Sequence, residues 1–95
     1  MTLVNMEARD KDAWVNYALG KMRLALIYNP FMLFTAESFI AGHVPVSPAD
    51  PRWAGAVFQR AKRAKLIKQL RSGLENEDVT APTSAGHRTP VWMKA

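Results

Sequence analysis

Basic side chains that could bind a polyanion gather in one short segment of the chain. From Arg52 to Arg71 there are seven lysine and arginine residues and no acidic one. Residues 1–50 hold four basic and five acidic side chains (net −1), whereas residues 51–95 hold nine and three (net +6), which gives +5 for the whole chain. Such an imbalance creates a local positive field that attracts polyanions. The alternative is a solvated surface with an accidental bias, so the geometry of the segment matters.

Other chemistry has little support in the residue types. The chain has no cysteine and two histidines, His43 and His87, with few carboxylates near them. We therefore expect no metal site and no cofactor, and His43 is expected to contact carbonyl groups at a helix end. No glycine-rich phosphate loop, paired-carboxylate pattern or serine-histidine-acid signature occurs, so we expect a binding protein and not an enzyme.

The basic segment begins with a predicted helix over residues 50–65, the candidate recognition helix. Asp50 is expected to cap it and Pro51 to occupy its first position. At 100° per residue, one half of the helix is apolar and is formed by Ala54, Val57, Phe58, Ala61 and Ala64, with Trp53 and Lys65 at its margins. The other half carries Arg52, Gly55, Ala56, Gln59, Lys62 and Arg63, with Arg60 at its edge.

The outer half of this helix suits the major groove of DNA. Arginine can make two hydrogen bonds to guanine, and glutamine can make two to adenine. Gly55 and Ala56 keep the surface low, which allows a close approach to base edges. Residues with the reach to contact phosphates are Arg60, Lys62, Lys65 and Lys68. A merely solvated amphipathic helix is the alternative, but such a face usually mixes both signs of charge.

The remaining elements follow from periodicity, caps and turn residues. Asp12 is expected to cap a first helix that runs to about Tyr28 and stops before Pro30. Phe31–Phe34 suggests a minimal strand, and Thr35 an N-cap for a second helix through about Ala41, ended by Gly42. The other expected segments are a turn over 43–49, a strand over 66–70, a long loop over 71–88 and a closing strand over 89–93.

This order predicts a mainly α fold with a small β-hairpin. Three helices followed by a two-stranded hairpin form a winged helix-turn-helix, with a wing sheet of two or three strands. We expect a flexible lead-in over residues 1–11 and a single winged-helix domain over residues 12–95. Trp14, Phe34, Phe39, Phe58 and Trp92 are expected in its core. Trp53 is expected to pack on the proline turn, the alternative being stacking on a sugar or a partner.

The wing loop, residues 71–88, has two parts of opposite character. Glu75–Asp78 is acidic and would be repelled by phosphate, whereas His87 and Arg88 could contact it. If the wing touches DNA, its second part is expected to do so, and a solvated tip is the alternative. The candidate DNA-binding residues are Arg52, Ala56, Gln59, Arg60, Lys62, Arg63, Lys68, His87 and Arg88.

Four segments carry a shared pattern: Phe34–Ser38, Asp50–Phe58, Ala64–Ile67 and His87–Trp92. Through them the chain resembles small winged-helix proteins of bacteriophages and prophages over about residues 12–93. The resemblance is a pattern of packing positions, with a glycine and a phenylalanine in the third helix and a short Val-Trp closing strand. It implies a winged-helix fold and DNA binding, while the acidic residues 75–78 depart from a basic wing.

Two functions remain open from the sequence. The first is a sequence-preferring protein for double-stranded DNA, in phage-type transcription control or replication. The alternative is an interaction module that binds an acidic partner protein through the same face. A homodimer fits both, with Leu24, Ile27 and Tyr28 lying off the main apolar face of the first helix. No uninterrupted apolar run is long enough for a signal peptide or a bilayer span, so we expect a cytoplasmic protein without membrane contact.

Overall fold

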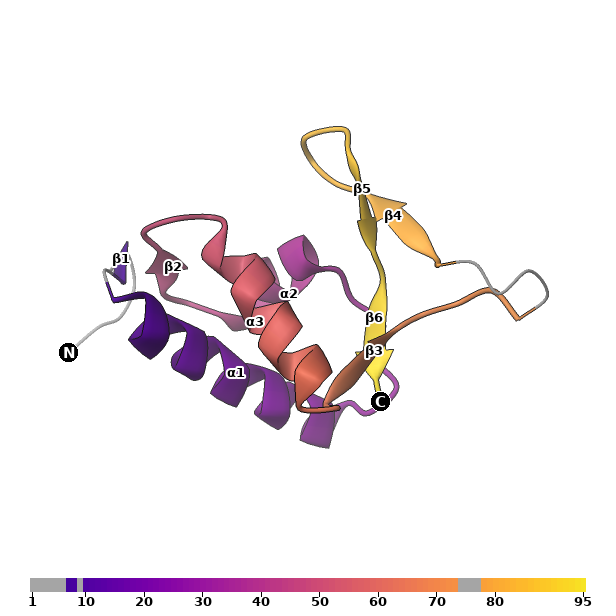
Figure 1. Ribbon diagram of the computed structural model, residues 1–95, viewed down its shortest axis with the longest axis horizontal. Coiled ribbons are helices and arrows are strands. Elements are labelled where there is room, and N and C mark those ends of the chain that lie inside the picture. The colour runs from indigo at the N-terminus through magenta and orange to yellow at the C-terminus, as the bar shows by residue number, and fades with distance from the viewer. Residues whose placement is uncertain (1–6, 9, 74–77) are drawn as a thin grey trace.

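The computed structural model describes residues 7, 8, 10–73 and 78–95, and Figure 1 shows the arrangement of their elements. The helices are α1 (Lys11–Tyr28), α2 (Ala36–His43) and α3 (Trp53–Arg63). The strands are β1 (Glu7–Ala8), β2 (Ser47–Pro48), β3 (Ile67–Gln69), β4 (Thr80–Pro82), β5 (Arg88–Pro90) and β6 (Trp92–Lys94). The described chain is thus a small mixed α/β fold of three helices and short strand pairs.

The N-terminus of α1 differs from the sequence prediction. Asp10, and not Asp12, is the N-cap: its backbone is extended and its carboxylate accepts a hydrogen bond of 3.1 Å from the Ala13 N–H. Asp12 lies in the first turn, where a negative charge interacts favourably with the helix dipole. Within the expected lead-in, Glu7–Ala8 pairs in parallel with Ser47–Pro48, while residues 1–6 and 9 lie outside the described part.

The predicted cap of α2 is confirmed, but its predicted end is wrong. The Thr35 hydroxyl accepts from the Ser38 N–H at 3.1 Å, and the Ser38 hydroxyl accepts from the Thr35 N–H at 3.0 Å, which forms a reciprocal capping box. Gly42 keeps a negative φ, so it does not terminate the helix. The helix continues to His43, and the Val44 N–H still bonds to the Ile40 carbonyl.

Both ends of α3 are shifted inward from residues 50–65. The N-cap is Arg52, without a side-chain cap bond, so the predicted positions of Asp50 as the cap and Pro51 as the first helical residue are wrong. The Asp50 carboxylate instead accepts from the Arg52 N–H at 2.9 Å in the turn before the helix. The first turn is tighter than an α-helix, since Trp53 N–H bonds to the Asp50 carbonyl at 3.0 Å, three residues back. At the other end Lys65 has φ 59°, and Leu66 N–H bonds to the Ala61 carbonyl at 3.0 Å. This is a Schellman motif, and it ends the helix at Arg63.

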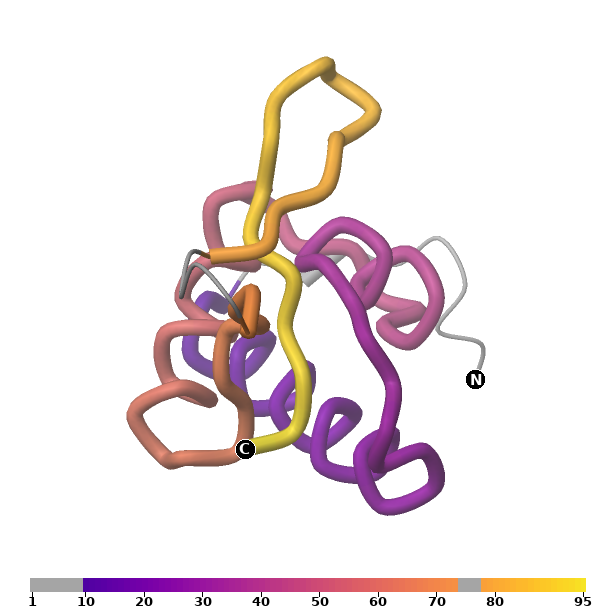
Figure 2. Tube along the Cα trace, turned by 90° about the vertical axis from the view of Figure 1, so that its right-hand side faces the viewer, coloured from indigo at the N-terminus to yellow at the C-terminus, as the bar shows by residue number. Residues whose placement is uncertain are grey.

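The strands after α3 form two antiparallel pairs. In the first, β3 pairs with β6 in the register Ile67↔Lys94 and Gln69↔Trp92. The predicted strand over 31–34 is reduced to one bridge, in which Phe34 and Trp92 exchange backbone hydrogen bonds of 3.1 and 2.7 Å. In the second, β4 pairs with β5 in the register Thr80↔Pro90 and Pro82↔Arg88. The β4–β5 hairpin rises above the helices in Figures 1 and 2. Strand β4 lies inside the segment predicted as a loop over 71–88, whereas β5 overlaps the start of the closing strand predicted over 89–93.

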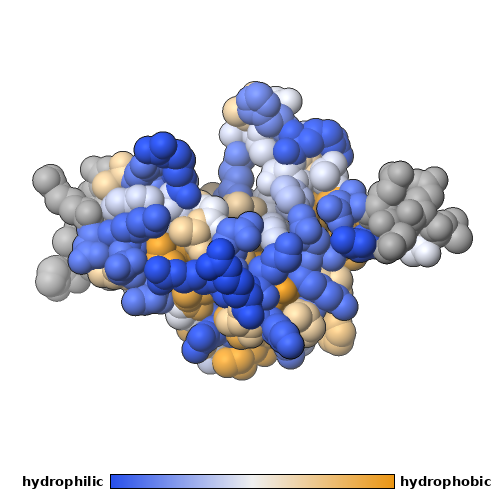
Figure 3. All heavy atoms as spheres, in the orientation of Figure 1, coloured by the Kyte–Doolittle hydropathy of each residue, from blue (hydrophilic) through white to orange (hydrophobic). Residues whose placement is uncertain are grey.

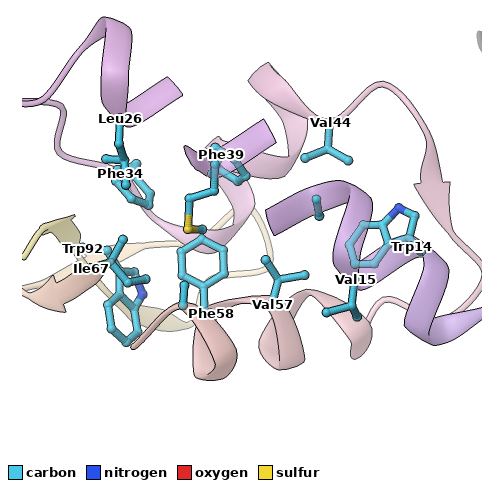
Figure 4. Packing of buried hydrophobic residues seen from close by; sticks show 13 residues of the cluster. Trp14, Val15, Leu26, Phe34, Phe39, Val44, Val57, Phe58, Ile67 and Trp92 are labelled. Atoms are coloured by element: carbon cyan, nitrogen blue, oxygen red, sulfur yellow. The ribbon is translucent and has the colours of Figure 1, made fainter. Parts of the chain in front are cut away.

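The core lies where the helices meet the β3–β6 pair. Phe58 of α3 is its centre: its ring is 5.6–6.1 Å from the rings of Phe34, Phe39 and Trp92. Figure 4 shows Phe58 and Val57 pointing from α3 into this cluster. Trp14 extends the core toward β2, and its Nε1–H donates to the Val46 carbonyl at 2.7 Å. The five aromatic residues expected in the core are all buried.

Candidate nucleic-acid interface

The predicted division of α3 into an inner and an outer face is largely confirmed. Val57, Phe58 and Ala61 are fully buried, and Ala54 is half-buried. Ala64 is exposed, because the Schellman turn at Lys65 takes the chain away from the core one residue later. The exposed residues of the outer face are Arg52, Gly55, Gln59, Lys62 and Arg63, while Ala56 is half-buried. Trp53 packs inward, with its ring 6.3 Å from that of Trp14.

Two of the candidate arginines on this side are already held by carboxylates. Arg52 binds Asp50 through its Nε and Nη2 at distances of 2.7–3.1 Å. These bonds lower the pKa of the Asp50 carboxyl and raise that of the Arg52 guanidinium. Arg60 reaches across to α1, where its Nη2 lies 3.2 Å from Asp12 and its Nη1 lies 3.5 Å from Asn16. Both arginines are therefore partly neutralised in the free protein.

Lys62, Arg63, Lys65 and Lys68 have no ion pair within the described chain, and they follow one another from the end of α3 into β3. Lys62 and Arg63 end α3, Lys65 forms the turn and Lys68 lies in β3. All four side chains are exposed. A hollow lined by Lys62, Lys65, Lys68 and Arg71 lies among them. We call Lys62, Arg63, Lys65 and Lys68 the basic cluster.

The basic cluster and the outer face of α3 lie on one side of the molecule. In Figure 3 hydrophilic side chains run across the centre of the view, over α3, and continue toward the β3–β6 pair. Gly55 and Gln59 are exposed on this surface, and a Cβ added at Gly55 would meet no atom within 4 Å. A polyanion lying along α3 would therefore meet uncharged groups first and the basic cluster next.

The hairpin candidates His87 and Arg88 are exposed but differ in their contacts. The Arg88 guanidinium folds back onto β4, donating to the Thr80 hydroxyl at 2.7 Å and to the Thr80 carbonyl at 2.6 Å. The His87 backbone N–H donates to the Thr83 hydroxyl at 3.2 Å. Of the acidic stretch, Glu75–Glu77 lies outside the described residues, whereas Asp78 forms an ion pair of 3.2 Å with Arg71.

A contact that the sequence did not indicate holds the hairpin tip against α2. The Glu37 carboxylate accepts hydrogen bonds from the Ser84 N–H at 3.2 Å and from the Ser84 hydroxyl at 3.1 Å. The two residues are 47 positions apart, so no local signal could have revealed the pair. This interaction fixes the hairpin beside the N-terminus of α2.

His43 also differs from its predicted role. It is the last residue of α2, and its ring stacks on Phe39 at a centroid distance of 5.1 Å. In the described ranges no group of three or more histidine and acidic residues is arranged to hold a metal ion. None of the helices seen in those ranges has both the length and the apolar character needed to cross a membrane.

Comparisons of the chain with protein-family models, curated proteins and solved structures gave no match. The resemblance to phage winged-helix proteins therefore stays a prediction from the sequence. The function must be argued from the site itself.

Proposed function

We propose that this chain is a winged-helix protein that binds double-stranded DNA, with α3 in the major groove. The observation that carries the proposal is the outer side of α3 and β3, where four cations without an ion pair among the described residues follow the exposed Gly55 and Gln59. The order of helix, bridge, two helices and paired strands agrees with a winged-helix domain. The β4–β5 hairpin takes the place of the wing.

The proposed roles divide between base reading and phosphate binding. Gln59 and Arg63 lie on the outer face of α3 and have side chains that can hydrogen-bond to base edges. Lys62, Lys65 and Lys68 are better suited to phosphates, because a lysine ammonium is a compact point charge without a fixed hydrogen-bonding fork. Arg52 and Arg60 would contact DNA only if their guanidinium groups left Asp50 and Asp12. In the hairpin, His87 is a better candidate for DNA contact than Arg88, because the Arg88 guanidinium is already bonded to Thr80.

One feature departs from the simplest helix-turn-helix unit. Residues 44–52 connect α2 and α3, and this is longer than the turn of about three or four residues that usually joins such helices. The connection is held by the pairing of β2 with β1 and by the Trp14 bond to Val46. α3 is therefore positioned by buried contacts with α1 as well as by α2.

The test is fluorescence anisotropy with a mixed pool of DNA duplexes over a salt series, with the bound sequences recovered and read. Binding that weakens steeply with salt and enriches one motif is expected for a sequence-preferring protein in transcription control or replication. Binding without enrichment would restrict the role to non-specific or architectural binding. No binding at low salt would contradict the proposal and favour an acidic partner protein at the same face.

A further inference from the structure

Large apolar side chains are exposed at the C-terminal end of α1 and in the turn that follows. Leu24, Ile27 and Tyr28 are 48%, 74% and 81% exposed, and Phe31 and Leu33 are 90% and 57% exposed. We call these five residues the α1 patch. In Figure 3 hydrophobic atoms gather along the lower edge of the molecule, below the end of α1.

The patch is not the outer edge of the core. The buried face of α1 is formed by other residues, Trp14, Val15, Ala18, Met22 and Leu26. Along the solvent-facing side of the same helix, Asn16 and Gly20 are followed by Leu24 and Ile27, so that this side changes from polar to apolar. Leu24 and Tyr28 are four residues apart, which places them on adjacent turns. From Leu24 to Ala36 the sequence contains no charged residue.

The exposed area is in the range of a specific interface. Aromatic side chains present about 150–250 Å² each, so Tyr28 and Phe31 together offer roughly 250–400 Å² at their exposed fractions, and the three aliphatic side chains add to this. The largest apolar patch on a typical monomer is about 300–600 Å². One side of a standard protein interface covers about 800 Å². The α1 patch with a modest polar rim reaches that size.

We propose that two copies of this chain associate through the α1 patch in a two-fold symmetric dimer. A partner of opposite charge has nothing to pair with inside the patch, whereas a second copy presents the same neutral, apolar surface. The shape also allows self-association. Tyr28 lines a hollow between α1 and α2 together with Leu24 and Met32, and Ile27 lines a second hollow together with Leu66. Cations stand only at the borders of the contact: Lys21 at the first hollow, and Arg23, Lys65 and Lys94 at the second. In a symmetric contact each copy supplies both rings and hollows.

The dimer would leave most of the proposed DNA surface accessible. Gly55, Gln59 and Arg63 are not part of the α1 patch, whereas Lys65 of the basic cluster borders it, because it lines the same hollow as Ile27. The inference stands whether or not the chain binds DNA. If it does, the dimer supplies two copies of α3, and the expected target is a pair of symmetric half-sites.

The experiment measures mass by light scattering with size-exclusion chromatography while the protein concentration is varied from about 5 to about 200 µM, because dimer formation follows mass action. The wild-type chain is expected to approach twice the 10.6 kDa of one chain. Leu33→Glu and Phe31→Glu are each expected to weaken the dimer by about 100-fold or more, because a buried unpaired carboxylate is strongly unfavourable.

Ala13→Glu is the matched control, because it adds the same charge to an exposed position of α1 about 20 Å from Ile27. It should dimerise like the wild type. Circular dichroism melting of every variant verifies that the fold is retained, and Phe31, which lies outside the helix, tests the patch without altering α1. A wild-type chain that stays monomeric over the whole range would overturn the proposal. So would a dimer that both patch variants leave intact.

Discussion

At the scale of single residues, the basic cluster includes a side chain in an unfavourable backbone conformation. Lys65 is the one described non-glycine residue with a positive φ, at 59°. Glycine is the residue usually found at this position of a Schellman motif, because it has no Cβ to clash. A lysine at this position places a cation next to Lys62 and Lys68, but it makes the fold less stable than a glycine would. Such an outlier supports a functional role for the side chain.

Replacing Lys65 separates the cost of its backbone conformation from the contribution of its positive charge to binding. Lys65→Gly is expected to stabilise the fold by about 0.5–1 kcal/mol, since relief of the left-handed conformation exceeds the added entropy of the unfolded chain. The same variant should weaken DNA binding and reduce the salt slope by about 1. Lys65→Ala removes the cation but keeps the strained conformation, so it should weaken binding without stabilising. Urea unfolding and anisotropy measure both quantities. Equal stability of the two variants would contradict this account of the turn.

Arg63 and Arg60 provide a second comparison between residues on one helix. Arg63 has no partner among the described residues, whereas Arg60 is held by Asp12 at 3.2 Å. Arg63→Ala is expected to lower the affinity for a preferred duplex by about 1–3 kcal/mol. Arg60→Ala should have a smaller effect, because DNA must first compete with the carboxylate. The two losses of affinity are compared by anisotropy on one duplex at one salt concentration. A larger loss in Arg60→Ala than in Arg63→Ala would contradict the base-reading role of Arg63.

At the scale of elements, the β4–β5 hairpin depends on contacts outside itself. A two-stranded hairpin of this length is marginally stable alone. Its base is joined to the rest of the chain by backbone bonds from the Val79 N–H to the Leu70 carbonyl and from the Leu70 N–H to the Val91 carbonyl, and its tip is held by Glu37 of α2. The position of the hairpin is thus set at both ends.

Glu37→Ala should release the tip without unfolding the protein. The contact is exposed, so the free energy of unfolding is expected to change by less than about 1 kcal/mol. The backbone of residues 83–87 should become mobile, with NMR order parameters falling toward about 0.6 or below. Glu37→Gln is the control, because its amide oxygen can still accept from Ser84. Unchanged order parameters in Glu37→Ala would show that β4 and β5 alone fix the tip.

The elements also show which features of the fold could be predicted from the sequence. The cap at Thr35 was predictable because its partner Ser38 is three residues away. The choice between Asp10 and Asp12 was not, since the path of the chain before α1 is set by the pairing of β1 with the distant β2. Strand β4 was missed for the same reason: its register with β5 is a long-range property that Thr80–Pro82 does not indicate by composition.

The same distinction applies to the candidate site. Helical periodicity predicted the exposed outer face of α3, because that pattern is local. It did not reveal that Asp12 neutralises Arg60 from another helix or that Arg88 turns back onto Thr80. Nor did it place Lys65 and Lys68 in one group with Lys62 and Arg63, which requires the turn after α3. Charge counts along the sequence therefore overstate the cations available to a ligand.

At the scale of the whole molecule, Phe58 joins the helices to the β3–β6 pair. It is buried and contacts rings from the bridge segment, α2 and β6. Phe58→Ala is expected to destabilise the fold by about 3–5 kcal/mol. Because the rings around Phe58 hold the helices and the β3–β6 pair together, the wild-type chain should unfold in one transition, with the same midpoint by circular dichroism and by tryptophan fluorescence. Two separated transitions would show that the helices and the strands unfold independently.

The distribution of free and paired charges over the molecule determines how salt should affect DNA binding. If the basic cluster makes the phosphate contacts while Arg52, Arg60 and Arg88 keep their present partners, four cations release counterions, and the slope of log K against log salt should be about −4. If all the basic side chains of residues 52–71 and the wing engage, the slope should be nearer −7. Removing Lys68 by substitution with serine should bring the first value to about −3 with no change in preferred sequence. A slope that Lys68→Ser leaves unaltered would mean that β3 does not face the duplex, and that the DNA lies along the N-terminal half of α3 and the hairpin.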